Sequence, residues 1–238
     1  MAALALFGAL ALSMLIGPAP PPFHGLDETV TTWAVTGRET ALTAVATLLH
    51  YGGMRPWGAV PMVIILAPLA WARRWSDLAL VLLAWIFTSA ITVEAFKELL
   101  GRPRPPEPLV ATHTSAFPSG HTAYAAVMGM ALVAVARNHR AWALAATLAV
   151  TVVMAWSRIY LGAHWLSDTV GGALLGWGIA LLLWGLWPAR PPLAARQSHP
   201  APPPAPLQRR PGRRDAPLRS SRARARRTRP ASKPLGRR

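Results

Sequence analysis

The chain has 238 residues, of which 53% are hydrophobic and 14% are charged, and its formal net charge at pH 7 is +16. The hydrophobic residues form long uninterrupted runs, which is typical of a polytopic helical membrane protein. The sequence contains no cysteine, which excludes a disulfide framework and any thiolate metal site.

Charge is concentrated at the C-terminal end of the chain. Residues 189–238 hold 15 of the 25 Lys and Arg residues and a single acid, Asp215, which gives this segment a net charge of +14. The preceding 188 residues carry about +2. A basic composition is therefore the sole support for nucleic-acid binding, and we expect no nucleic-acid partner.

The first 50 residues contain one apolar run and one mixed segment. Residues 2–17 are apolar and uncharged and are followed by prolines, so they form either a short first transmembrane span or a cleaved signal peptide. The absence of Lys or Arg before this run favours the retained span. Residues 23–50 interleave charged side chains such as Asp27 and Arg38 with apolar ones such as Trp33. This pattern predicts amphipathic helix that lies at the membrane interface or packs on the bundle.

Five more apolar runs predict five further membrane crossings. They extend approximately over residues 57–71, 78–96, 119–137, 141–156 and 165–187. Together with the first run they predict an all-α, polytopic membrane helix bundle with about six transmembrane helices, formed by residues 1–188.

Basic residues at the ends of the runs predict how the bundle is oriented. Four arginines fall on the same side as the C-terminal tail under this alternation: Arg73, Arg74, Arg137 and Arg140. The positive-inside bias places that side in the cytoplasm of a plasma-membrane protein. The loop 98–118 and the stretch 157–165 then emerge together on the outer face.

The tail, residues 189–238, is dominated by Pro, Ala and Arg and has almost no large aliphatic residues. It is expected to be disordered and cytoplasmic. Next to a membrane it is expected to contact anionic lipid headgroups, at about 1 kcal/mol per basic residue close to the surface. The alternative is a solvated tail without a specific function.

Two groups of polar residues border the loop 98–118. Lys97 is followed after six residues by Arg104 and Pro105, and the glycine and prolines of this loop end the helix, so that Arg104 can fold back over Lys97. Alternatively, both cations simply anchor a helix end at the headgroups. The second group, Pro118-Ser119-Gly120-His121, opens a helix whose unpaired backbone N–H groups can cradle an anion. It can equally be an ordinary helix cap with an interfacial histidine.

The third group is Arg158, His164 and Asp168, between two apolar runs. His164 and Asp168 are four residues apart, so a helix that begins here would place them on one face. The carboxylate can then hold one imidazole nitrogen and leave the other as an oriented nucleophile or base. Arg158 can present its planar fork of donors to an anion. This combination at a membrane surface indicates chemistry on a phosphate.

In order, the three groups read Lys-x6-Arg-Pro, Pro-Ser-Gly-His and Ser-Arg-x5-His-x3-Asp. With these three motifs the chain resembles the type 2 phosphatidic acid phosphatase family, whose superfamily includes the vanadium haloperoxidases. Every fixed position of the family signature is matched. The resemblance covers roughly residues 50–188 and is weaker before them, and the basic tail has no counterpart in the family core.

The resemblance and the chemistry together imply a metal-independent phosphatase without a cofactor. The implied catalytic residues are His164, which would form a phosphohistidine, Asp168, which would hold its other nitrogen, and His121, the general acid and base. The residues implied to bind the phosphoryl oxygens are Lys97, Arg104, Ser119, Gly120 and Arg158. The substrate would be a lipid phosphate or polyprenyl pyrophosphate, with undecaprenyl pyrophosphate as the leading candidate because the site faces outward.

Two other functions remain open at this point. The same residue set can support a vanadate-dependent haloperoxidase, although that chemistry is associated with soluble relatives. A non-catalytic membrane scaffold that binds lipid or a partner through the basic tail predicts the loss of His121, His164 or Asp168, and all three are present.

Overall fold

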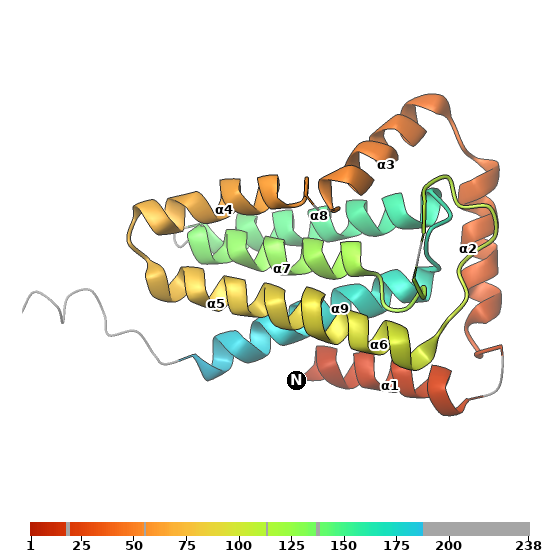
Figure 1. Cartoon of the computed structure of the whole chain (residues 1–238), viewed down its shortest axis with the longest axis horizontal. Coiled ribbons are helices and arrows are strands. Elements are labelled where there is room, and N and C mark those ends of the chain that lie inside the picture. Colours follow the sequence, from red (N-terminus) through yellow and green to blue (C-terminus); the bar gives the residue numbers. More distant parts are fainter. Residues whose placement is uncertain (18–19, 55, 113, 137–138, 188–238) are drawn as a thin grey trace, which may run out of the picture. The chain divides into compact units, whose positions relative to one another are not determined.

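The computed structural model describes residues 1–17, 20–54, 56–112, 114–136 and 139–187, and within these ranges every regular element is a helix (Figure 1). The prediction of an all-α fold is therefore confirmed. The basic tail lies outside the described residues, so its predicted disorder and the predicted domain boundary at residue 188 stay predictions. The elements in chain order are α1 (Ala2–Ile16), α2 (His24–Thr36), α3 (Thr40–Gly52), α4 (Ala59–Trp71), α5 (Trp75–Trp85), η1 (Ile86–Thr92), α6 (Val93–Leu100), α7 (Gly120–Val135), α8 (Arg140–Tyr160) and α9 (Leu166–Leu186).

Each of the six apolar runs of the sequence coincides with a helix, and the run 78–96 coincides with the continuous helix that α5, η1 and α6 form. Three helices in the described ranges are long and apolar enough to cross a membrane: the continuous helix Trp75–Leu100, α8 and α9. The helices α1, α4 and α7 are equally apolar in character but shorter. The count of six crossings stays a prediction. One boundary differs from expectation, because α8 continues to Tyr160 and thus places Ser157 and Arg158 in its last turn.

The helix Trp75–Leu100 is interrupted at its centre by η1, a π-helix of seven residues. Thr92 Oγ1 donates a hydrogen bond to the Phe87 carbonyl, 2.7 Å away and five residues earlier, across this wide turn. The side chain of Thr88 in η1 is fully buried. Single π-helical turns inside α-helices occur frequently at functional sites, and the far end of this helix carries Lys97.

The centre of the bundle is α7, which packs against α8 and α9 through small residues (Figure 1). A Cβ added at Gly172 of α9 would lie 2.4 Å from the carbonyl oxygen of Ser119, and one at Gly176 would lie 2.6 Å from that of Ala123. A Cβ at Gly129 of α7 would lie 2.4 Å from Thr147 Cγ2 in α8. These glycines let the helix backbones approach closely, as small residues do in membrane helix pairs.

The mixed segment 23–50 forms α2 and α3, which contact α8 and, for α2, also α9. Figure 1 shows α2 running across the end of the bundle at which α6 and α8 end and α7 and α9 begin. Of the two predicted arrangements, at the interface or packed on the bundle, the packed helix is confirmed. The side chain of Asp27 is buried, with 2% of its surface exposed, whereas that of its neighbour Glu28 is 61% exposed.

Candidate active site

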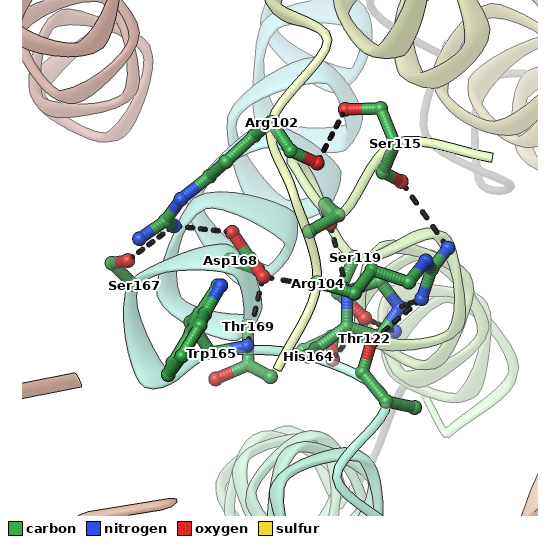
Figure 2. A network of polar contacts seen from close by, with 12 residues as sticks. Arg102, Arg104, Ser115, Ser119, Thr122, His164, Trp165, Ser167, Asp168 and Thr169 are labelled. Atoms are coloured by element: carbon green, nitrogen blue, oxygen red, sulfur yellow. Dashed lines mark hydrogen bonds and ion pairs between the residues drawn. The ribbon is translucent and has the colours of Figure 1, made fainter. Parts of the chain in front are cut away.

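The eight residues predicted to carry the chemistry lie at this same end of the bundle. They come from the end of α6, the α6–α7 loop (residues 101–119), the start of α7, the last turn of α8, the α8–α9 loop (residues 161–165) and the first turn of α9. Hydrogen bonds and short contacts connect them into one cluster, part of which Figure 2 shows. In chain order they are Lys97, Arg104, Ser119, Gly120, His121, Arg158, His164 and Asp168.

His164 is held in one tautomer by the backbone. Its side chain is 3% exposed, and Nδ1 lies 2.7 Å from the carbonyl oxygen of Ala116. Because a carbonyl oxygen only accepts, Nδ1 carries the proton and Nε2 keeps its lone pair. Burial, together with the nearby guanidinium groups of Arg158 and Arg104, holds the pKa of His164 well below its usual value of 6.5. The ring is therefore neutral at neutral pH, and the lone pair of Nε2 is available.

Asp168 does not hold His164 in the way the sequence predicted. Its Oδ2 lies 3.6 Å from His164 Nδ1 and accepts a 2.8 Å hydrogen bond from the backbone N–H of Trp165. The reason is the start of α9 at Leu166: the carboxylate caps this helix from its third position, and His164 lies before the helix rather than on its face. The Ala116 carbonyl orients the imidazole, and the Asp168 carboxylate lies beside it without a hydrogen bond.

Arg104 reaches Nε2 of His164. Its Nη1 lies 3.3 Å from His164 Nε2 and donates to the carbonyl oxygen of Ala163 at 2.6 Å. Its other nitrogens donate to the carbonyl oxygens of Thr114, at 2.7 Å, and Ser115, at 3.2 Å. The backbone of both loops thus fixes the guanidinium, and Arg104 also lines a polar cavity of about 490 Å³.

Lys97 lies between two cavities. Its Nζ is 3.3 Å from Oε1 of Glu94, which lies one turn earlier in α6. Lys97 lines the polar cavity together with Arg104. It also lines a second cavity, of about 790 Å³, whose wall includes His121 and the apolar side chains of Met62, Trp85 and Val93. Lys97 therefore lies between a polar cavity and a largely apolar one.

The start of α7 brings Gly120 and His121 to the wall of this second cavity, and Ser119 lies just before them, fully buried. Ser119 caps the helix, with its Oγ accepting from the hydroxyl of Thr122 at 3.1 Å and its backbone N–H donating to the Asp168 carbonyl at 2.9 Å. Gly120 lies close to Lys97, since a Cβ added there would be 3.9 Å from Nζ. The predicted role of Ser119 and Gly120 in binding phosphate stays a prediction.

His50, in the last turn of α3, is a neighbour of the site that the sequence analysis missed. Its Nδ1 accepts a 2.8 Å hydrogen bond from Nη1 of the buried Arg158, and its ring stacks on that of His121 at 5.2 Å between centroids. Nε2 of His121 donates to the His50 carbonyl at 3.0 Å, which leaves the lone pair of His121 on Nδ1. Burial and the charge of Arg158 lower the pKa of His50 from 6.5 to about 4, so it accepts as the neutral ring.

Arg102 and Asp27 were missed as well. Arg102 Nη1 donates to Asp168 Oδ1 at 2.5 Å, and its Nη2 lies 2.7 Å from Asp27 Oδ2. In the sequence, Arg102 looks like an ordinary loop residue two positions before Arg104, and Asp27 is one of several charges in a mixed segment. Neither has a local signal in the sequence, because Arg102 is 66 residues away from Asp168 and 75 residues away from Asp27. The three side chains meet only in the folded bundle.

In the described ranges there is no group of three or more His, Cys, Asp or Glu side chains that could hold a metal ion. The expectation of a site without metal or cofactor stays a prediction. The arrangement can nevertheless handle an anion, because it gathers the cations Lys97, Arg104 and Arg158 near a neutral, oriented imidazole.

Comparison with known proteins places this site in a family. The family model of the PAP2 superfamily matches residues 78–192. Phosphatidylglycerophosphatase B of Bacillus subtilis is 32% identical over 158 residues, which cover 63% of this chain and 77% of that protein. The Escherichia coli protein of the same name is 38% identical over 96 residues, but the match covers only 33% of its length. A putative undecaprenyl-diphosphatase of Escherichia coli, YbjG, is 40% identical over 60 residues and is covered to 29%.

Two solved structures share the arrangement of helices. The crystal structure of the transmembrane PAP2 type phosphatidylglycerolphosphate phosphatase from Bacillus subtilis has a TM-score of 0.67 and 29% identity, and the match covers 77% of this chain and 93% of that one. The structure of Aquifex aeolicus LpxE has a TM-score of 0.57 at 23% identity, covers 67% of this chain and 95% of that one, and shows the fold alone. From the cluster of residues and these likenesses we conclude that the chain belongs to the PAP2 superfamily, as a membrane lipid phosphatase.

Proposed function

We propose that this phosphatase removes the terminal phosphate of a lipid phosphate or polyprenyl pyrophosphate through a phosphohistidine on His164. The observation that carries the proposal is the hydrogen bond from Nδ1 of His164 to the Ala116 carbonyl, at 2.7 Å. This bond leaves the lone pair of Nε2 available, and Nε2 lies 3.3 Å from a guanidinium nitrogen of Arg104. A phosphoryl group in front of Nε2 would therefore meet a nucleophile and a fixed cation together.

In the first step, Nε2 of His164 attacks the phosphorus, and the bond from phosphorus to the lipid oxygen breaks. His121 enters this step as the imidazolium, protonated at Nδ1 as well as at Nε2, a form that the negative charge of the bound phosphoryl group favours. It donates the proton on Nδ1, the nitrogen that does not bond to the His50 carbonyl, to that oxygen. In the second step, His121 takes a proton from water, the water oxygen attacks the phosphorus, and the bond to His164 breaks. Inorganic phosphate leaves, and both histidines return to their starting states.

Fixed cations take the role that a metal ion has in many phosphoryl-transfer enzymes. Lys97, Arg104 and Arg158 are proposed to hold the phosphoryl oxygens, assisted by the hydroxyl of Ser119 and the backbone N–H of Gly120. Arg158 supports this role because its Nε is buried and has no hydrogen-bond partner among the described residues. We therefore expect catalysis without an added metal or cofactor.

The apolar cavity of about 790 Å³ supports a lipid substrate, because its wall joins Lys97 and His121 to Met62, Trp85 and Val93. The site lies at the end of the bundle opposite Arg73, Arg74 and Arg140. The positive-inside bias then favours a site on the outer face of the plasma membrane and a cytoplasmic basic tail that contacts anionic headgroups. An outer site favours undecaprenyl pyrophosphate, while the likeness to the Bacillus subtilis protein favours phosphatidylglycerophosphate.

The test uses the full-length protein purified in detergent, with phosphate release measured from undecaprenyl pyrophosphate, phosphatidylglycerophosphate and phosphatidic acid. We expect release to persist in EDTA, to be blocked by vanadate and to be lost in His164→Ala. The control is His139→Ala, which removes an exposed histidine before α8, at the other end of the bundle. After an acid-free quench, ³¹P NMR should detect a base-stable, acid-labile phosphohistidine in the wild type.

Metal-dependent release that survives His164→Ala would contradict the mechanism. Halogenation of a test substrate in the presence of vanadate and peroxide, without release of lipid phosphate, would indicate the haloperoxidase instead. Loss of a cellular phenotype on deletion of residues 189–238, in a protein that hydrolyses none of the three lipids, would favour the scaffold.

A further inference from the structure

A buried ionic network connects α2 to the active site through Arg102. The guanidinium of Arg102 reaches two carboxylates: its Nη1 donates to Asp168 Oδ1 at 2.5 Å, and its Nη2 donates to Asp27 Oδ2 at 2.7 Å. The side chain of Arg102 is 9% exposed, and those of Asp27 and Asp168 are 2% and 0% exposed. Figure 2 shows the Arg102 guanidinium between Ser167 and Asp168. One cation is thus enclosed between two acids from different helices.

Ser167 completes this network. Its backbone N–H donates to Asp27 Oδ1 at 2.8 Å, and its hydroxyl donates to Asp27 Oδ2 at 2.7 Å. The same hydroxyl accepts from Arg102 Nη1 at 2.7 Å. Both carboxylate oxygens of Asp27 therefore accept hydrogen bonds from α9 or from Arg102, as a buried charge requires. Asp27 therefore joins α2 to the start of α9 and to the α6–α7 loop.

At pH 7 the network carries a net charge of −1 close to His164, because it contains two acids and one base and burial raises the pKa of Asp168 only to about 6. Without Asp27, the charge of Asp168 would be neutralised by Arg102, and the network would have no net charge. The surroundings of His164 make this difference important, since the groups that face it from the other elements are cationic or neutral. They are Lys97 from α6, Arg104 from the α6–α7 loop, His121 from α7 and Arg158 from α8.

The proposed reaction needs a negative charge here. When Nε2 of His164 bonds to phosphorus while Nδ1 keeps its proton, the ring becomes positively charged. The three cations that hold the phosphoryl oxygens oppose this charge, and an acid near Nδ1 stabilises it. Asp168 Oδ2 is 3.6 Å from Nδ1, but Asp168 also forms an ion pair with Arg102. Asp27 supplies a second negative charge, so that the network stays anionic although Arg102 neutralises Asp168.

We propose that Arg102 and Asp27 are positioning residues for catalysis: Arg102 fixes the Asp168 carboxylate, and Asp27 keeps the network anionic so that Asp168 stabilises the phosphorylated His164. This inference rests on the proposed function. It makes α2, which lies outside residues 78–192 matched by the family model, a part of the active site.

The charge count predicts opposite effects of two substitutions. Asp27→Asn changes the network from −1 to zero, which disfavours protonated His164 and moves the acidic limb of the pH profile of kcat/KM to lower pH. Arg102→Gln changes it to −2 and moves the limb to higher pH. The double variant returns the network to −1, and its limb returns toward that of the wild type. We expect Asp27→Asn to lower kcat about tenfold or more with KM within about twofold, because the charge acts on the covalent step.

Matched controls separate charge from folding. Glu28→Gln removes the same charge from the next residue of α2, where the side chain is 61% exposed, and is expected to leave kcat and the pH limb unchanged. Arg102→Lys keeps the charge but loses the fork that joins both acids, so kcat should fall while the limb stays in place. Each variant is first required to elute as a single species in detergent, and its unfolding temperature is recorded. If Asp27→Asn does not pass this step, Arg102→Lys and Arg102→Gln decide the question.

The assay is phosphate release from phosphatidylglycerophosphate, or from whichever of the three lipids is hydrolysed fastest. The inference is overturned if Asp27→Asn behaves like Glu28→Gln, or if folded Asp27→Asn and Arg102→Gln move the limb in the same direction or not at all. It is also overturned if Arg102→Lys is less stable but has the kcat of the wild type. A failure of the proposed function looks different, because His164→Ala would then release phosphate as fast as the wild type.

Discussion

Gly53, just after α3, offers a test of the active-site geometry that alters none of the predicted site residues. A Cβ added to Gly53 would lie 2.4 Å from Cδ2 of His121 and 3.2 Å from its Nε2. These ring atoms are held by the stack on His50 and by the hydrogen bond from Nε2 to the His50 carbonyl. The substitution Gly53→Ala therefore forces the His121 ring out of its position.

The size of the effect follows from the contact distance. Ordinary contacts of a Cβ begin at 3.4 Å, so the ring must move by about 1 Å, the scale at which misplacement of a catalytic group costs up to about 100-fold in rate. We expect kcat to fall about 10- to 100-fold, which corresponds to about 1.4–2.7 kcal/mol of activation free energy. Stability should fall by about 1–3 kcal/mol, as for other overpacked sites.

Gly52 is the matched control, because a Cβ added there would meet nothing within 4 Å. Phosphate release and thermal unfolding are measured for Gly52→Ala and Gly53→Ala side by side in detergent. Gly52→Ala should keep the kcat of the wild type. The reasoning is refuted if folded Gly53→Ala is as active as the wild type, or if both substitutions lower kcat equally.

Three further predictions concern pH and stability. Because burial and two arginines hold the pKa of His164 below 6.5, the acidic limb of kcat/KM should lie below pH 6.5. The same lowered pKa means that the contribution of His164 to stability is fully present above pH 6.5 and is lost as the pH falls, whereas the pKa of Asp168, which burial raises to about 6, contributes with the opposite sign below that pH. Thermal unfolding of the wild type and of His164→Ala across pH isolates the histidine's contribution. Tyr160→Phe removes the hydroxyl that accepts from the Glu39 N–H at 2.6 Å and donates to the Glu39 carbonyl at 3.1 Å. The substitution should lower the unfolding free energy by about 1–2 kcal/mol with little change in kcat. An unchanged unfolding temperature would contradict this prediction. Gly129→Ala places a Cβ 2.4 Å from Thr147 Cγ2 and 2.9 Å from its Cα. The substitution should lower the unfolding free energy by about 1–3 kcal/mol. An unfolding temperature equal to that of the wild type would show instead that α7 and α8 can move apart without cost.

The helices could be predicted from the sequence because the membrane imposes a simple rule on composition. Apolar runs long enough to cross a bilayer must form helices there, and the structure has a helix in each predicted run. The positions of helix ends were less certain. Arg158 belongs to the last turn of α8 because Ser157 is buried against α3, with its hydroxyl donating to the Ala46 carbonyl at 3.0 Å. A tertiary contact of this kind is not visible in a hydropathy pattern.

The motif residues were also found from sequence, since their spacing is a local property, but their supporting partners were not. The acceptor for Nδ1 of His164 is the backbone carbonyl of Ala116, and a carbonyl has no signature in the sequence. His50 and Asp27 lie in a segment whose pattern indicates an amphipathic helix, where histidine and aspartate usually face water. Their burial follows from the way α2 and α3 cross the end of the bundle, which a single sequence does not specify.

The wide turn η1 sets the register of everything that follows it along the same helix. An α-helix advances 100° per residue, so the extra residue that a π-turn accommodates rotates the next segment by about this angle relative to an uninterrupted helix. The direction in which Lys97 projects is therefore determined one and a half turns earlier, within Ile86–Thr92. A one-residue deletion there would preserve every motif and every apolar run, yet it would turn the lysine away from the cavity that it now borders.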